Sequence, residues 1–100
     1  MVILAVKIKV KADKVLEAEK FFSLFPQRAQ SEKGCLQYEL FRVPTDSQLF
    51  YFFEKWATQE EFNEHSSQPY LKEFASRYSE ILECPNEVLF LENFNLEPKV

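Results

Sequence analysis

Residues 49–56 read Leu49-Phe-Tyr-Phe-Phe-Glu-Lys-Trp56 and are the most informative segment of the chain. It is rich in aromatic residues, and side chains along a strand alternate between two faces, so the stretch predicts a β-strand. Both faces would be apolar, with Leu49, Tyr51 and Phe53 on one and Phe50, Phe52 and Trp56 on the other. An apolar face of a sheet must pack against another layer that shields it from water. The stretch therefore predicts a sheet that is buried on both sides.

Three further stretches alternate in the same way, at residues 2–10, 35–43 and 88–96. In the first, Val, Leu and Ile occupy every second position, which is typical of a strand. Residues 44–47, Pro-Thr-Asp-Ser, have the composition of a turn. We therefore expect 35–43 and 49–56 to pair as a hairpin.

Apolar residues at helical spacing predict helices between these strands. Asp13 is expected to cap the first helix, and Pro26 should end or kink it, or begin a new turn at its first position. Gly34, the only glycine, is a natural stop after a second, short polar helix. Thr58 and Glu61 form a capping box that opens a third helix. The four helices are expected at residues 13–25, 27–33, 58–65 and 69–82.

The resulting order, β-α-β-β-α-β, predicts an α+β fold of the ferredoxin-like type. Helices then cover one face of an antiparallel sheet and leave the other face open. A chain of 100 residues forms a single domain, residues 1–100, and has nothing left to cover the open face. We therefore expect a homodimer packed sheet to sheet, in which each chain supplies half of a barrel-like core.

Composition and charge exclude several classes of partner. The formal net charge of −4 gives no general attraction to nucleic acid or to an anionic membrane. Cys35 and Cys84 lie far apart without metal-site spacing, so no metal is expected, although a disulfide between them stays open. Lys7 and Lys9 interrupt the apolar start, which is typical neither of a signal peptide nor of a membrane span. We expect a cytoplasmic protein with reduced thiols.

Four segments together resemble the antibiotic biosynthesis monooxygenase family. They are Glu32–Leu40 with its Gly-Cys-Leu-Gln-Tyr run, Phe50–Trp56 with Glu-Lys-Trp, Glu60–His65, and Pro69-Tyr70. The resemblance extends over nearly the whole chain. It implies a dimeric ferredoxin-like barrel with a pocket between the sheet and the helices of each subunit. Members include oxygenases of quinols and polyphenols that use no metal or flavin, haem-degrading proteins, and isomerases of small phosphorylated signals.

Two departures from the family pattern reduce the number of these activities that we expect of this chain. Haem-degrading members resemble this pattern but carry an Asn in the first strand, and residues 1–10 have none, so no haem is expected. Some members have a second His after the proline, where this chain has Tyr70. That substitution weakens a two-histidine acid/base mechanism of the isomerase kind. By resemblance, the positions left to carry chemistry are Glu54, Trp56, His65 and Tyr70.

Each of these four residues also has a purely structural interpretation. His65 is the only histidine and suits proton transfer near neutral pH, but it could equally be bonded to backbone or solvated at a helix end. Trp56 could orient a ring or simply fill the core, and Tyr70 could donate a proton or simply pack. Glu54 could be a base with a raised pKa, but a salt bridge with Arg42 or Lys55, or a dimer contact, is the preferred interpretation. The candidate substrate-binding residues are Tyr38, Tyr51, Phe62 and Phe74.

The leading hypothesis is a cofactor-independent monooxygenase of a quinol or similar electron-rich aromatic molecule, with molecular oxygen as second substrate. Aromatic side chains suit an aromatic substrate, and the sequence has no metal or nucleotide motif. The alternatives are a small-molecule isomerase of the same fold and a ligand-binding dimeric module without turnover.

Overall fold

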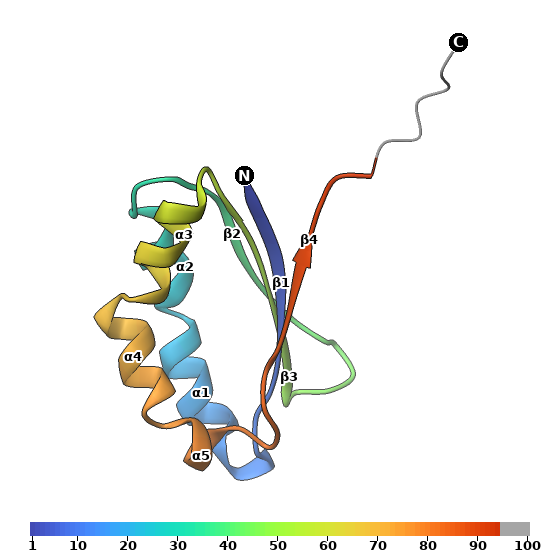
Figure 1. Ribbon diagram of the computed structural model, residues 1–100. Coiled ribbons are helices and arrows are strands. Elements are labelled where there is room, and N and C mark those ends of the chain that lie inside the picture. The colour runs from blue at the N-terminus through green and yellow to red at the C-terminus, as the bar shows by residue number, and fades with distance from the viewer. Residues whose placement is uncertain (95–100) are drawn as a thin grey trace.

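The computed structural model describes residues 1–94, and in it a layer of helices packs against one face of a β-sheet (Figure 1). The predicted α+β, ferredoxin-like arrangement is confirmed. The elements are β1 (Val2–Lys9), a 3₁₀ turn (Ala12–Lys14), α1 (Val15–Phe22), α2 (Phe25–Gln30), β2 (Cys35–Arg42), β3 (Leu49–Trp56), α3 (Gln59–Ser66), α4 (Pro69–Ala75), α5 (Tyr78–Ile81) and β4 (Glu87–Leu91).

The four strands form one antiparallel sheet in the order β2-β3-β1-β4. β1 and β3 are central and pair along their whole lengths, from Val2 opposite Trp56 to Lys9 opposite Leu49. The predicted hairpin of β2 and β3 is present, with one irregularity in its register at Leu36. This topology places the inner side chains of β2, β3 and β1 side by side under the helices.

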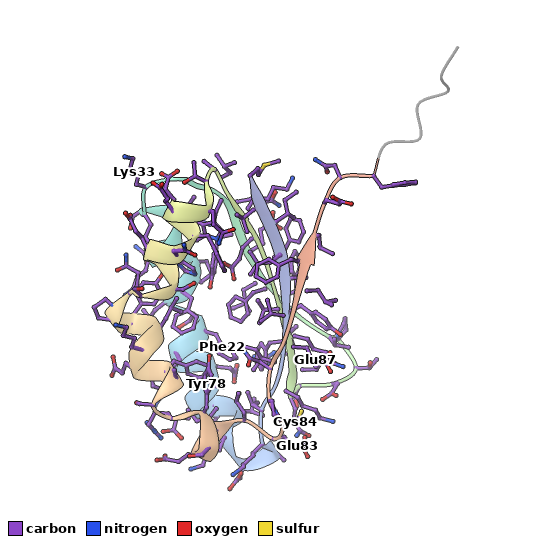
Figure 2. All side chains as sticks on the ribbon, in the orientation of Figure 1. Phe22, Lys33, Tyr78, Glu83, Cys84 and Glu87 are labelled. Atoms are coloured by element: carbon purple, nitrogen blue, oxygen red, sulfur yellow. The ribbon has the colours of Figure 1, made fainter. Side chains whose placement is uncertain are left out.

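The core lies between the helices and the inner face of the sheet. Its centre is Phe22 on α1, which is fully buried (Figure 2). The Phe22 ring packs at 4.9–5.8 Å from four other phenylalanine rings, mostly edge to face, a geometry that adds to the energy of burial. Those rings belong to Phe25, Phe50, Phe52 and Phe74.

The outer face of the sheet has no cover from residues 1–94 (Figure 1). It nevertheless carries large apolar side chains, as the alternation in residues 49–56 predicts. Phe41 is 50% exposed, and Leu89 and Leu91 on β4 are 61% and 45% exposed. Tyr51 and Phe53 alternate with the buried residues of β3 and are half-buried on this face.

Several predicted boundaries are wrong. Asp13 makes no capping hydrogen bond and lies within the 3₁₀ turn, so α1 begins at Val15. The helix predicted at 69–82 is two helices, because Arg77, with φ −106° and ψ 5°, lies outside the helical conformation. Its side chain bonds Glu17 of α1. β4 ends at Leu91 rather than at 96, and the last residues of that prediction lie outside the described ones.

The predicted N-cap of α3 by Thr58 is confirmed, although the Glu61 carboxylate bonds the Thr58 hydroxyl rather than the Thr58 backbone N–H of a full capping box. The Thr58 hydroxyl accepts a hydrogen bond from the Glu61 backbone N–H at 3.1 Å and donates one to the Glu61 carboxylate at 2.9 Å. A Ser or Thr in this position satisfies an otherwise unpaired N–H of the first turn. The cap fixes the start of α3, and the last turn of the same helix carries His65.

Gly34→Ala should destabilise the protein by about 1–2 kcal/mol, because Gly34 has a φ of +83°, a conformation that costs L-residues roughly this amount. The added Cβ would also meet the Glu61 carboxylate and disturb the α3 cap. Urea unfolding of the variant beside Lys33→Ala, at the exposed neighbouring position, measures the effect. Equal stability of the two variants would contradict the expectation.

Candidate active site

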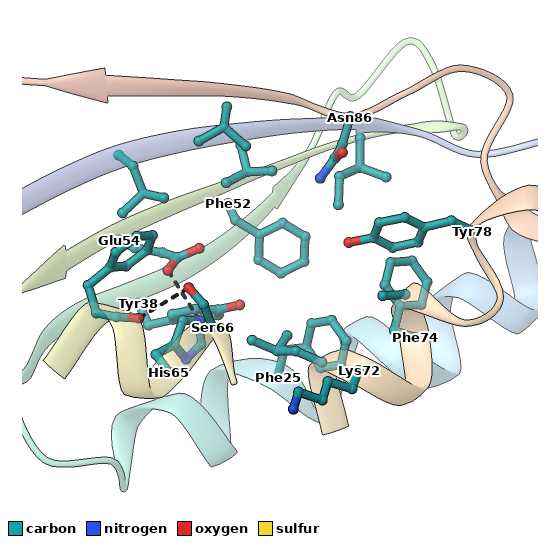
Figure 3. Close-up of a pocket in the computed structure, with 17 residues that line it drawn as sticks. Phe25, Tyr38, Phe52, Glu54, His65, Ser66, Lys72, Phe74, Tyr78 and Asn86 are labelled. Atoms are coloured by element: carbon teal, nitrogen blue, oxygen red, sulfur yellow. Dashed lines mark hydrogen bonds and ion pairs between the residues drawn. The ribbon is translucent and has the colours of Figure 1, made fainter. Parts of the chain in front are cut away.

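A cavity of about 250 Å³ lies between the inner face of the sheet and helices α3 and α4 (Figure 3). Its middle is apolar, and polar side chains lie toward its two ends. Glu54, Tyr38, His65 and Ser66 form one end, and Lys72, Tyr78 and Asn86 the other. The apolar walls are Leu4, Val6, Ile8, Phe25, Phe52, Phe62, Leu71, Phe74, Ala75 and Val88.

Glu54 is a buried carboxylate at this cavity. It lies on the inner face of β3 and is 5% exposed. Its Oε1 accepts a hydrogen bond from Trp56 Nε1 at 3.0 Å and lies 3.4 Å from His65 Nε2. Burial raises the pKa of Glu54, and the Trp56 hydrogen bond and His65 oppose that rise only in part. Among the described residues only Oε1 is engaged, and the other oxygen points toward the cavity (Figure 3).

His65 lies between two carboxylates. Its ring stacks on Trp56 with centroids 4.3 Å apart, which holds the imidazole in one orientation. Nε2 faces Glu54, while Nδ1 lies 3.0 and 3.2 Å from the two carboxylate oxygens of Glu32. The side chain is 4% exposed. A buried histidine with an acidic group on each nitrogen can pass a proton from one side to the other.

Tyr70 lies behind His65 and not in the cavity. Its hydroxyl donates a hydrogen bond to Glu32 Oε2, and its oxygen is 3.4 Å from His65 Nδ1. Burial, together with the Glu32 carboxylate, raises the pKa of Tyr70, so the phenol stays protonated. Tyr70 lines a separate surface depression, where Arg28 lies over its ring.

Tyr38 brings a hydroxyl to the cavity beside Glu54. It is opposite Glu54 in the pairing of β2 with β3, is 3% exposed, and directs its hydroxyl end into the cavity (Figure 3). Burial and the neighbouring carboxylates raise the pKa of Tyr38. The hydroxyl therefore remains a hydrogen-bond donor at any physiological pH.

The structure thus brings most of the predicted site residues together. Glu54 and His65 face the cavity, with Trp56 directly behind them. Of the candidate substrate-binding residues, Tyr38, Phe62 and Phe74 line the cavity. Tyr51 does not, because it points from the opposite face of the sheet.

The predicted salt bridge of Glu54 with Arg42 or Lys55 is wrong. Lys55 follows it on the strand and therefore points to the other face. Arg42 instead bonds Glu19 of α1 at 2.8 Å. Glu54 instead contacts groups of the site, since it accepts a hydrogen bond from Trp56 and lies 3.4 Å from His65 Nε2.

Glu32 is a site residue that the sequence analysis missed. It lies in the loop between α2 and β2, inside one of the segments that carry the family resemblance. Nothing in its local pattern distinguishes it from a surface glutamate, since His65 is 33 positions away in the sequence. Its place in the Glu32–Leu40 segment is the signal that could have pointed to it.

The acidic side chains, helices and cysteines of residues 1–94 bear on three other features: a metal centre, a membrane span and a disulfide. No group of three or more His, Cys, Asp or Glu in this part of the chain is placed to hold a metal ion. The helices described there are all too short or too polar to cross a membrane. Cys35 is half-buried and Cys84 exposed, and both are free thiols rather than a disulfide.

Known proteins share both sequence and fold with this chain. An uncharacterized protein of Synechocystis sp. is 32% identical over 87 residues, which are 87% of this chain but 59% of that protein. The chain thus spans less than two thirds of that relative.

Among solved structures, a Pseudomonas aeruginosa protein is 22% identical and superposes with a TM-score of 0.87 over 94% of both chains. A crystal structure named antibiotic biosynthesis monooxygenase is 16% identical, with a TM-score of 0.88 over 95% of this chain and 100% of that one. These two likenesses establish the fold. The profile of the family described as antibiotic biosynthesis monooxygenase matches residues 1–77, so the chain belongs to that family.

Proposed function

We propose that the protein is a cofactor-independent monooxygenase of a quinol or similar electron-rich aromatic molecule. One observation carries the proposal: the Glu54–His65 pair faces a cavity whose middle is lined by aromatic and aliphatic side chains. A buried carboxylate with a raised pKa is a suitable base near neutral pH. Membership of the family and the name of one structural relative support oxygenation as the reaction.

Deprotonation of the substrate starts the proposed reaction. Glu54 takes the phenolic proton, and the Tyr38 hydroxyl donates a hydrogen bond to the phenolate oxygen. The electron-rich anion then reduces oxygen directly and forms a carbon–oxygen bond to it. A quinol and O₂ give a hydroxyquinone and water, so one oxygen atom enters the substrate and four electrons leave it. The apolar walls exclude bulk water from this step.

We also propose a homodimer that packs sheet to sheet and works in the cytoplasm. The exposed apolar side chains on the outer face, among them Phe41, Leu89 and Leu91, support the dimer. A second copy offers a face of the same shape and polarity, as a two-fold interface requires. Two free thiols, Cys35 and Cys84, are compatible with a reducing compartment.

Oxygen uptake tests the oxygenase. Wild-type protein without added metal or flavin should oxidise at least one member of a panel of reduced naphthoquinols and anthrones well above autoxidation. His65→Ala should lose about 100-fold or more of that rate, because Glu54 then has no group to relay its proton. Circular dichroism checks that the variant is folded.

The other outcomes of this experiment point to other functions. Product formed equally well without oxygen would identify an isomerase. Thermal stabilisation by a ligand that is not converted would identify a binding module. Equal acceleration by wild type and His65→Ala would contradict the role given to His65.

A further inference from the structure

We propose that Glu54, His65 and Glu32 form a proton relay in which Glu32 stores the substrate proton while oxygen reacts and then returns it. Glu32 is thereby assigned a part in the reaction although it lies outside the cavity. The inference rests on the proposed function for the identity of the reaction. Its geometry stands independently of any substrate.

The three side chains form a continuous path from the cavity outward. Glu54 Oε1 is 3.4 Å from His65 Nε2, and His65 Nδ1 is 3.0 Å from Glu32 Oε2. The exposed fraction of the side chain is 6% for Glu54, 4% for His65 and 12% for Glu32. Both inner groups are thus shielded from solvent, and the outermost group has limited access to it.

A bound substrate makes such a path necessary. Glu54 is 5% exposed, and its unengaged oxygen faces the cavity that the substrate would fill. Once the substrate occupies that cavity, a proton on Glu54 has no route back to water through it. Among the described contacts of Glu54, His65 is the only group that can take a proton away from the cavity, because Trp56 Nε1 can only donate.

The proton balance of the reaction also requires that the protein keep the phenolic proton rather than release it to solvent. Removing one phenolic proton gives an anion, and its reaction with O₂ gives a peroxide anion. This anion must regain one proton before it can eliminate water and leave the hydroxyquinone. The overall reaction therefore releases no proton to solvent, and the one taken at the start is needed again.

The relay meets this requirement with two proton transfers in opposite directions, first outward to Glu32 and then back to the substrate. In the first, the substrate O–H bond breaks and an O–H bond forms on Glu54. That proton moves to His65 Nε2 as the Nδ1 proton moves to Glu32. In the second, Glu32 returns its proton to Nδ1, the Nε2 proton returns to Glu54, and Glu54 protonates the peroxide anion. His65 begins and ends with its proton on Nδ1.

Tyr70 is a positioning residue in this scheme. Its hydroxyl donates to Glu32 Oε2, the oxygen nearest His65 Nδ1. The phenol stays protonated because its pKa is raised, so it holds the Glu32 carboxylate in place without accepting the relayed proton. Its position behind the ring explains why Tyr70 belongs to the site but does not line the cavity.

A single histidine allows the relay to be tested without any substrate. The ¹⁵N spectrum of the imidazole reports which nitrogen carries the proton, and His65 is the only histidine in the chain. In wild type the neutral ring should be protonated on Nδ1. In Glu32→Ala that preference should disappear, and formate at high concentration should restore it by occupying the vacated site. Glu64→Ala, at the exposed position beside His65, should behave as wild type.

Turnover provides the second readout. Glu32→Ala should lower kcat roughly 10- to 100-fold with KM nearly unchanged, as is typical when a partner of a reacting group is removed. Formate should restore part of the rate. Glu32→Gln keeps the shape of the side chain but cannot store a proton, so it should stay slow with formate as well as without it.

The relay is overturned if His65 carries its proton on Nε2 in wild type, or if Glu32→Gln turns over at the wild-type rate. Failure of the proposed function looks different. Wild type would then oxidise no quinol, while His65 would still show the Nδ1 proton and its dependence on Glu32. That result would support the relay geometry and leave only the reaction to be reassigned.

Discussion

Glu54→Gln should abolish oxygen uptake, lowering kcat by about 100- to 10,000-fold, because the variant cannot remove the phenolic proton. The amide has nearly the shape of the carboxylate and can still accept the Trp56 N–H, so substrate should bind with a KM close to that of wild type. Oxygen uptake by wild type, Glu54→Gln and the exposed control Glu64→Gln provides the comparison. A rate for Glu54→Gln within a few-fold of wild type would remove Glu54 from the reaction.

The same substitution should make the protein more stable at neutral pH. Burial raises the pKa of Glu54, so the folded state holds that proton more tightly than the unfolded state does. Folding is therefore weakened as pH rises from the ordinary value of 4.5 through the raised value, and it is not weakened below both. Glutamine does not titrate. Urea unfolding should show a gain of about 1 kcal/mol at pH 7–8 that vanishes near pH 4.

Leu89→Glu should convert the proposed dimer into a monomer. Leu89 lies on the outer face of β4 opposite Ala5, and an unpaired carboxylate buried there in an interface costs several kcal/mol. That energy raises the dissociation constant at least 100-fold. Light scattering at micromolar concentration should give twice 11.9 kDa for wild type and 11.9 kDa for the variant.

Leu16→Glu is the matched control for this experiment. Leu16 is 77% exposed on α1, away from the sheet, and should tolerate the same change without loss of the dimer. A wild-type mass of 11.9 kDa would contradict the dimer itself. Persistence of the dimer in Leu89→Glu would place the interface elsewhere.

The strands could be predicted because their side chains follow a strict period of two. In residues 49–56 that period also separates Glu54 and Trp56 on the inner face from Tyr51 and Lys55 on the outer face. This alternation alone therefore excludes Tyr51 from the cavity and excludes Lys55 as an ionic partner of Glu54. The alternation along the strand thus contains the information that corrects both predictions.

The remaining parts of the site depend on contacts that no local pattern contains. Glu32 contacts His65 and Tyr70 because α3 and α4 pack over the loop that precedes β2. In the sequence, Glu32 lies 33 positions from His65 and 38 from Tyr70. At the break between α4 and α5, Arg77 likewise bonds Glu17, 60 positions away. Such long-range contacts belong to the tertiary structure, which can override local helical propensity.

The stacking of Trp56 on His65 makes the protein optically responsive to its own chemistry. Both residues occur once in the chain, so all tryptophan emission arises from an indole whose neighbour, 4.3 Å away, is the relay imidazole. An imidazole ring that gains positive charge becomes an electron acceptor and quenches an excited indole in contact with it. The fluorescence of the unlabelled protein therefore reports whether His65 becomes charged, and a relay in which both protons move together predicts emission that stays unquenched during turnover.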